Sequence, residues 1–204
     1  MGFIVARAPF RLSFAGGGTD LPAFYKHDSG EVVSTTINKY VYVIINSRDH
    51  IFGKGIDDPY SYKFRLSYSN TENVHNADQI SHPIVREALK LLEIDDPLDI
   101  ATMADIPAGT GLGSSATFSV SLLHALHTYK GEELHPQQLA EEAAHIEINV
   151  LNRPVGKQDH YAAAFGGLNT YRFNTNGTVE IEPLNIKQSI TESIFDALLL
   201  LNTG

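Results

Sequence analysis

The 204-residue sequence contains no cysteine. This absence excludes disulfides and thiolate chemistry and fits a reducing compartment. The sequence also has no apolar run of the roughly 20 residues that a membrane span requires. Its N-terminus lacks the basic segment and apolar core of a secretory signal. We therefore expect a soluble, cytoplasmic protein without a membrane partner.

Basic residues are scarce as well. The sequence has 15 Lys and Arg against 24 Asp and Glu, so its formal net charge is −9. Such a balance argues against binding to nucleic acid or to anionic membranes. Hydrophobic residues make up 43%, and the length suffices for one sizeable domain or slightly more. Nothing in the composition indicates an oligomeric state.

Glycine, in contrast, is concentrated in residues 106–118, where Gly109, Gly111 and Gly113 precede two serines and an apolar run at helical spacing. A glycine-rich loop that leads into a helix presents free N–H groups and the positive dipole end to phosphate oxygens. No Lys precedes the serines, and the glycine spacing differs from Gly-x-Gly-x-x-Gly, so neither a Walker A loop nor a dinucleotide motif is present. The alternative is a flexible turn with a serine N-cap.

The wider pattern Pro-x-x-x-Gly-Leu-Gly-Ser-Ser-Ala, which begins at Pro107, resembles a motif of the superfamily of galactokinase, homoserine kinase, mevalonate kinase and phosphomevalonate kinase (GHMP kinases). The resemblance implies that this loop wraps the triphosphate of ATP. It also implies that Ser115, or its neighbour Ser114, binds Mg2+ while the other hydroxyl caps the helix. The implied phosphate-binding residues are Pro107, Gly109, Gly111, Leu112, Gly113, Ser114, Ser115 and Ala116.

A second glycine cluster lies near the N-terminus, where Pro9 and Arg11 lead to the turn Gly16-Gly17-Gly18-Thr19-Asp20. By local chemistry Asp20 is the N-cap of a short helix over residues 21–25. The resemblance implies instead that Asp20 binds substrate hydroxyls. This turn replaces the common Gly-Glu-His-x-Asp and resembles the branch of the heptose 7-phosphate kinases and related fucokinases. The implied substrate contacts are Arg11, Gly17, Gly18, Thr19, Asp20, Lys157 and Gln158.

Two further carboxylates have two interpretations each. Asp159 follows Gly156-Lys157-Gln158 and precedes a short helix that paired glycines end, so local chemistry makes it an N-cap. The resemblance implies that it is the catalytic aspartate. Glu147 lies near the end of a predicted helix and is a surface acid by pattern, whereas the resemblance implies a magnesium ligand. His124 and His127 could form a metal pair, but without a third ligand we favour packing or surface roles.

Periodicity predicts alternating strands and helices. The expected strands cover residues 3–8 with 11–14, 30–37, 40–46, 62–68, 98–103, 168–173 and 179–183; the expected helices cover 83–93, 114–129 and 136–149. Asp49–Pro59 is an expected loop and Ser69–Ser81 a surface excursion. The resemblance implies an α+β fold similar to ribosomal protein S5 domain 2.

The resemblance also implies two domains. Residues 1–185 would form the N-terminal domain, which binds ATP and sugar. Residues 186–204 would begin the C-terminal domain, apparently truncated, since an apolar strand expected over Ala197–Leu201 ends the sequence and the third glycine-rich motif of the family is missing.

The implied activity is ATP- and Mg2+-dependent phosphorylation of a sugar at its anomeric hydroxyl. We expect D-glycero-D-manno-heptose 7-phosphate as the substrate, with Arg7, Arg11 and Lys157 as candidates to pair with its distal phosphate unless they are ordinary surface cations. The alternatives are a fucokinase- or galactokinase-like free-sugar kinase, a kinase of a mevalonate- or homoserine-type alcohol, and a truncated nucleotide-binding domain without turnover.

Overall fold

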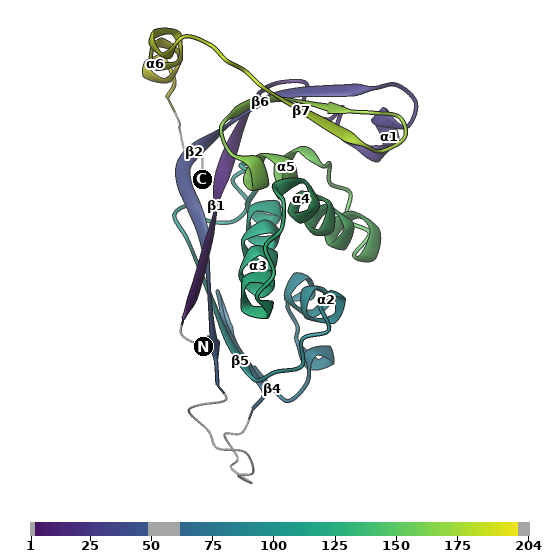
Figure 1. Cartoon of the computed structure of the whole chain (residues 1–204), viewed down its shortest axis with the longest axis vertical. Helices are drawn as coiled ribbons and strands as arrows, with labels where there is room; N and C mark the ends of the chain where they lie inside the picture. The colour runs from purple at the N-terminus through teal and green to yellow at the C-terminus, as the bar shows by residue number, and fades with distance from the viewer. Residues whose placement is uncertain (1–2, 49–61, 200–204) are drawn as a thin grey trace.

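The computed structural model describes residues 3–48 and 62–199, so the expected loop at 49–59 lies outside the described residues (Figure 1). Its elements, in chain order, are β1 (Ile4–Ala15), α1 (Pro22–Tyr25), β2 (Gly30–Ser47), β3 (Phe64–Ser67), β4 (Thr71–Val74), the 3-10 turn η1 (Ala77–Gln79), α2 (Pro83–Leu91), β5 (Leu98–Ala104), α3 (Ser114–Lys130), α4 (Pro136–Ala144), the π-helix η2 (His145–Val150), α5 (Gln158–Phe165), β6 (Leu168–Phe173), β7 (Val179–Pro183) and α6 (Gln188–Asp196). The α+β fold is confirmed.

The strands form one mixed sheet of seven strands, organised around β2. The order is β4-β3-β5-β2-β6-β7, and β1 pairs with β2 in addition. One half of β2 pairs with β5 and the other half with β6, while β1 follows nearly its whole length. Of the strand pairs in the described part of the chain, β3 and β5 alone are parallel. The strands predicted at 168–173 and 179–183 are confirmed as β6 and β7, which form an antiparallel hairpin.

Helices α2 to α5 cover one face of this sheet, with α3 at the centre (Figure 1). The apolar side chains of the sheet's inner face pack with those of α2 and α3 into the main core. The helix predicted over residues 114–129 is confirmed as α3, and ten of its 17 residues are buried. A helix that packs against strands on one side and helices on the others has little polar face left.

Two predictions about β-structure are wrong. Residues 38 and 39 do not separate two strands, because β2 continues through them; the register with β1 shifts there, since Pro9 pairs with Tyr40 and Arg11 with Thr36, which leaves the extra residues on β2. The segment at 69–81 is not a plain excursion, because it forms β4 and η1.

The end of the described chain also differs from prediction. Gln188–Asp196 forms the helix α6. A strand was expected over Ala197–Leu201, but Ala197 to Leu199 form none, and the remainder lies outside the described residues. No residue of α6 is buried, although Ile190 and Ile194 give it an apolar face. The domain boundary near residue 185 stays a prediction. In the described ranges, no helix has the length and apolar character to cross a membrane.

Candidate active site at the α3 N-terminus

The glycine-rich loop reaches α3 through three left-handed residues. Gly109, Gly111 and Gly113 have φ angles of 87°, 74° and 82°, values that L side chains rarely adopt. Gly113 is also the N-cap of α3, and no side chain caps the helix. The predicted serine cap is therefore wrong. A glycine N-cap leaves the amides of the first turn without a side-chain acceptor, which is the arrangement that binds anions.

Asp159 lies directly against this loop. A Cβ atom on Gly113 would be 3.0 Å from Asp159 Oδ2. The Nε of Arg11 donates to Asp159 Oδ1 over 2.6 Å, and its Nη1 donates to the carbonyl of Gly111 over 2.9 Å. Asp159 stands in the first turn of α5, whose N-cap is Lys157, so the N-cap interpretation of Asp159 is wrong. Arg11 thus ties one carboxylate, 24% exposed, to the glycine-rich loop.

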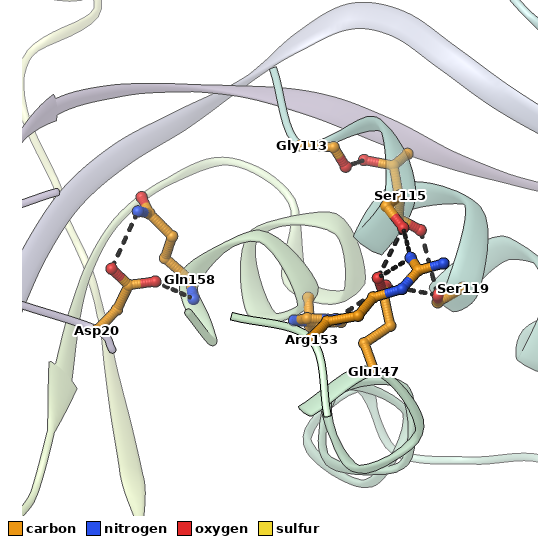
Figure 2. Close-up of polar contacts among 9 residues, drawn as sticks. Asp20, Gly113, Ser115, Ser119, Glu147, Arg153 and Gln158 are labelled. Atoms are coloured by element: carbon orange, nitrogen blue, oxygen red, sulfur yellow. Dashed lines mark hydrogen bonds and ion pairs between the residues drawn. The ribbon is translucent and has the colours of Figure 1, made fainter. Parts of the chain in front are cut away.

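A second carboxylate, Glu147, is surrounded by donors beside the same helix (Figure 2). Ser115 Oγ donates to its Oε2 over 2.6 Å and Arg153 Nη1 over 2.8 Å, while Ser119 Oγ donates to Oε1 over 2.7 Å. His160 Nε2 lies 3.2 Å from Oε1. Glu147 is 1% exposed, so the surface-acid interpretation is wrong. Burial opposes ionisation, but the hydrogen bonds and charge of His160 and the two serines outweigh it and lower the pKa of Glu147 to about 2.

The helices α3 and η2 bring the two serines and Glu147 together. Ser115 and Ser119 are four residues apart and therefore share one face of α3. The helix predicted over 136–149 is α-helical only to Ala144 and continues as the π-helix η2, in which Ile146 and Glu147 are buried. A π-helical turn is wider than an α-helical one and often occurs at functional sites.

The oxygens of Ser115 and Glu147 fit a magnesium ion. Mg2+ prefers hard oxygen donors and commonly takes one or two protein ligands together with water and substrate phosphates. The carboxylate is ionised, and Ser115 is exposed at the mouth of the cluster. Within residues 3–48 and 62–199 there is no cluster of three or more His, Cys, Asp or Glu suited to a metal. A magnesium ion bound here would therefore have the oxygens of Ser115 and Glu147 as its protein ligands, and water or substrate phosphates as the others.

The N-terminal turn is fixed from within. Asp20 is 2% exposed; its Oδ1 accepts from Gly18 N and Gln158 Nε2, and its Oδ2 accepts from Gln158 N over 3.1 Å (Figure 2). Thr19 Oγ1 donates to Gly16 O and accepts from Glu31 N. Asp20 does not cap α1, whose N-cap is Leu21.

These two side chains hold the turn itself, while Gly17 and Gly18 are exposed. The capping interpretation of Asp20 is therefore wrong, and the predicted sugar contacts of Thr19 and Asp20 stay predictions.

The three cations considered for a distal phosphate do not lie in one cluster. Only Arg11 contacts Asp159. Lys157 Nζ donates to Gly177 O over 2.6 Å and lies 5.2 Å from the ring centroid of Tyr25; burial lowers its pKa. Arg7 stacks on Tyr40 and lines a separate pocket of about 270 Å³ with His124.

His127 is buried beside two carboxylates and does not pair with His124 in the described structure. Both of its ring nitrogens lie 2.7 Å from carboxylate oxygens, one of Glu132 and one of Glu142. His124 is exposed. Glu142 therefore belongs to this cluster.

The sequence reasoning missed three residues of the Glu147 cluster: Ser119, Arg153 and His160. Ser119 could have been found from its helical spacing to Ser115, and His160 from its position next to Asp159. Arg153 has no local signal, because its contact with Ser115 joins residues 38 positions apart.

Comparison with known proteins places these features in a family. Residues 83–167 match the model of the GHMP kinases N terminal domain. The chain is 32% identical to a D-glycero-alpha-D-manno-heptose 7-phosphate kinase of Campylobacter jejuni over 94% of this chain and 57% of that protein. A galactokinase of Thermotoga maritima is 24% identical over 89% of this chain and 49% of its own length.

Among solved structures, one described as "D-glycero-D-manno-heptose 1-phosphate kinase from Bacteriodes thetaiotaomicron" superposes with a TM-score of 0.79 at 28% identity, over 93% of this chain and 62% of that one. The chain thus spans about half to three fifths of the length of these relatives.

Proposed function

This chain belongs to the GHMP kinase family, and we propose that it supplies the ATP- and sugar-binding part of a kinase that phosphorylates a hydroxyl group of a sugar phosphate. The observation that carries the proposal is the position of Asp159. Arg11 holds its carboxylate against Gly113, at the loop and helix end suited to phosphate. A base next to a phosphate site is what transfer to a hydroxyl group requires.

Different residues of the chain would bind the phosphates, hold the metal ion and accept the proton. Phosphoryl transfer depends on positioning and charge neutralisation more than on covalent chemistry. The loop amides from Gly109 to Ser115 would bind the phosphates of ATP, and Ser115 and Glu147 would hold Mg2+. The bound ion would neutralise charge on the phosphate oxygens. Asp159 would accept the proton of the attacking hydroxyl while Arg11 fixes its orientation.

For the acceptor we propose a heptose phosphate. The relative and the structure named above carry different names, one for a 7-phosphate substrate and one for a 1-phosphate. We favour D-glycero-D-manno-heptose 7-phosphate, with its anomeric hydroxyl at Asp159. The exposed backbone of Gly17 and Gly18 gives a surface without side chains on which a long sugar can lie. We propose Lys157 as the cation for the distal phosphate, because the adjacent Gln158 is hydrogen-bonded to Asp20, the proposed sugar ligand.

A free-sugar kinase is the second candidate, which the similarity to galactokinase supports. An ADP-release assay separates the two, with heptose 7-phosphate, heptose 1-phosphate, unphosphorylated heptose, fucose and galactose as acceptors. It should be run on this chain and on any longer protein that contains it. We expect the highest kcat/KM with heptose 7-phosphate. If removal of the 7-phosphate leaves kcat/KM unchanged, the free-sugar function replaces the proposal; nucleotide binding without turnover in both proteins would indicate a binding domain.

A further inference from the structure

Arg153 occupies the position that a shared cation would take between the two proposed metal ligands. Its Nη1 donates to Ser115 Oγ over 2.7 Å and to Glu147 Oε2 over 2.8 Å, and these two oxygens are joined by a hydrogen bond of 2.6 Å (Figure 2). One positively charged nitrogen therefore contacts both oxygens at once. A divalent cation bound to the same pair would compete with it directly.

The two oxygens of Glu147 have different surroundings. Oε1 is bound by Ser119 and His160, which are 0% and 1% exposed. Oε2 is bound by Ser115, an exposed residue, and by Arg153, whose side chain is 32% exposed. Buried partners cannot leave without repacking the core, whereas a partly exposed guanidinium can move into solvent. Only the Oε2 side of the carboxylate is thus open to exchange.

The backbone keeps Arg153 near this site even when its side chain moves. Its N–H donates to the carbonyl of Glu147 over 2.9 Å, and Asn152 before it adopts a left-handed φ of 51°. Because the backbone of Arg153 is held in place, its guanidinium can move only as far as its own side chain reaches. That region includes Ser115, in the first turn of α3, where we propose that the phosphates of ATP bind.

We propose that Arg153 is an exchangeable counter-ion that becomes a phosphate ligand. It neutralises Glu147 when no nucleotide is bound, yields the Ser115–Glu147 oxygen pair to the incoming divalent cation, and then donates to the phosphates of the nucleotide. A buried carboxylate without a partner is costly, so the guanidinium leaves only when another cation takes its place. Its planar set of donors suits phosphate oxygens. This inference rests on the proposed function.

The proposal gives Arg153→Gln two opposite effects. Without the guanidinium as a competitor, a divalent cation alone should bind more tightly. Without a donor for the phosphates, nucleotide should bind more weakly once the cation is present. A residue with only a structural role would not change the two affinities in opposite directions.

The test uses Mn2+ as the probe, because the electron paramagnetic resonance signal of the free ion reports how much is bound. We expect Arg153→Gln to bind Mn2+ on the order of tenfold more tightly than the unchanged chain, and a non-hydrolysable ATP analogue with saturating Mn2+ on the order of tenfold more weakly. Arg172→Gln is the matched control, since the side chain of Arg172 forms an exposed ion pair with Glu31 on β2, away from the Glu147 cluster. It should match the unchanged chain in both measurements.

Glu147→Gln separates this inference from the proposed function. If Glu147→Gln loses Mn2+ but Arg153→Gln binds it no more tightly than the unchanged chain, the exchange is overturned and the metal ligands stand. If Glu147→Gln binds Mn2+ as before, both the exchange and the metal ligands are overturned. Unchanged nucleotide affinity in Arg153→Gln overturns the phosphate contact.

Should Arg153→Gln not fold, Arg153→Lys replaces it. Its affinities for Mn2+ and for nucleotide should shift in the same directions but by less; unchanged affinities would overturn the proposal.

Discussion

The site contains two buried carboxylates, Asp20 and Glu147, that are almost equally shielded from water at 2% and 1% exposure. Their partners differ in charge. Among the described residues, the donors to Asp20 are neutral: the amide of Gly18 and the backbone and side-chain nitrogens of Gln158. Glu147 accepts from a guanidinium and from two serines, and a histidine lies beside it.

The difference shows how one buried acid can fix the backbone while another remains available to a ligand. Asp20 is enclosed, because a Cβ atom on Gly156 would overlap its Oδ2. Glu147 keeps one oxygen next to exposed groups. Three consecutive residues of α5 connect the two: Gln158 bonds to Asp20, His160 to Glu147, and Asp159 between them lies against the loop. We infer that the two acids hold Asp159 from both sides.

The largest expected effect is at Asp159, which lies between the two acids. Asp159→Asn should lower kcat by roughly 10²–10⁴-fold, because an amide cannot accept the proton of the hydroxyl. Nucleotide affinity should change little, since asparagine keeps the size and shape of Asp159 beside the loop and the Glu147 cluster is untouched. Steady-state kinetics with heptose 7-phosphate and a nucleotide-binding titration measure both. A variant with more than half of the original kcat would contradict the assignment.

The contribution of Glu147 to the free energy of unfolding should depend on pH. Its pKa of about 2 in the folded chain lies below the ordinary value of 4.5. The charged group therefore stabilises the fold fully above pH 4.5, and this contribution is lost as the pH falls toward 2. Glu147→Gln should be less stable than the unchanged chain at pH 6, by on the order of a few kcal/mol, and nearly equal to it near pH 2. Urea unfolding across this range tests it; a pH-independent difference would show that the charge is not responsible.

The family resemblance pointed to the glycine-rich loop, Asp159 and Glu147. The structure brings all three together at the N-terminal end of α3, while their roles in binding and catalysis stay predictions. The partners of these residues depend on distant contacts that no local pattern encodes. Asp20 and Gln158 are 138 positions apart.

The same limit applies to the fold. The helices α2 and α3 and most of the strands followed from periodicity, but the unbroken course of β2 depends on pairing with β1, β5 and β6. The π-helical turn at Glu147 likewise had no signal in the helical pattern of residues 136–149. Tertiary pairing, rather than local propensity, decided both features.

A smaller effect should come from adding a methyl group beside Asp20. In Gly156→Ala the new Cβ would overlap Asp20 Oδ2, so the loop or the carboxylate must move. Overpacking of this kind typically costs about 1–3 kcal/mol. Chemical denaturation should therefore show a lower free energy of unfolding than in the unchanged chain. Equal stability would mean that the enclosure of Asp20 is looser than its contacts suggest, and the contrast with Glu147 would weaken.

The smallest effect on stability is expected at Gly17, on the exposed side of the same turn. A Cβ atom there would have no neighbour closer than Gln158 Nε2, at 4.0 Å, and its φ is not left-handed. Gly17→Ala should therefore change the free energy of unfolding by less than about 0.5 kcal/mol. The methyl group would nevertheless project onto the surface proposed for the sugar, so KM for heptose 7-phosphate should rise roughly tenfold while KM for ATP stays constant. An unchanged sugar KM would mean that the turn does not contact the sugar, and that Asp20 fixes the backbone for Asp159 alone.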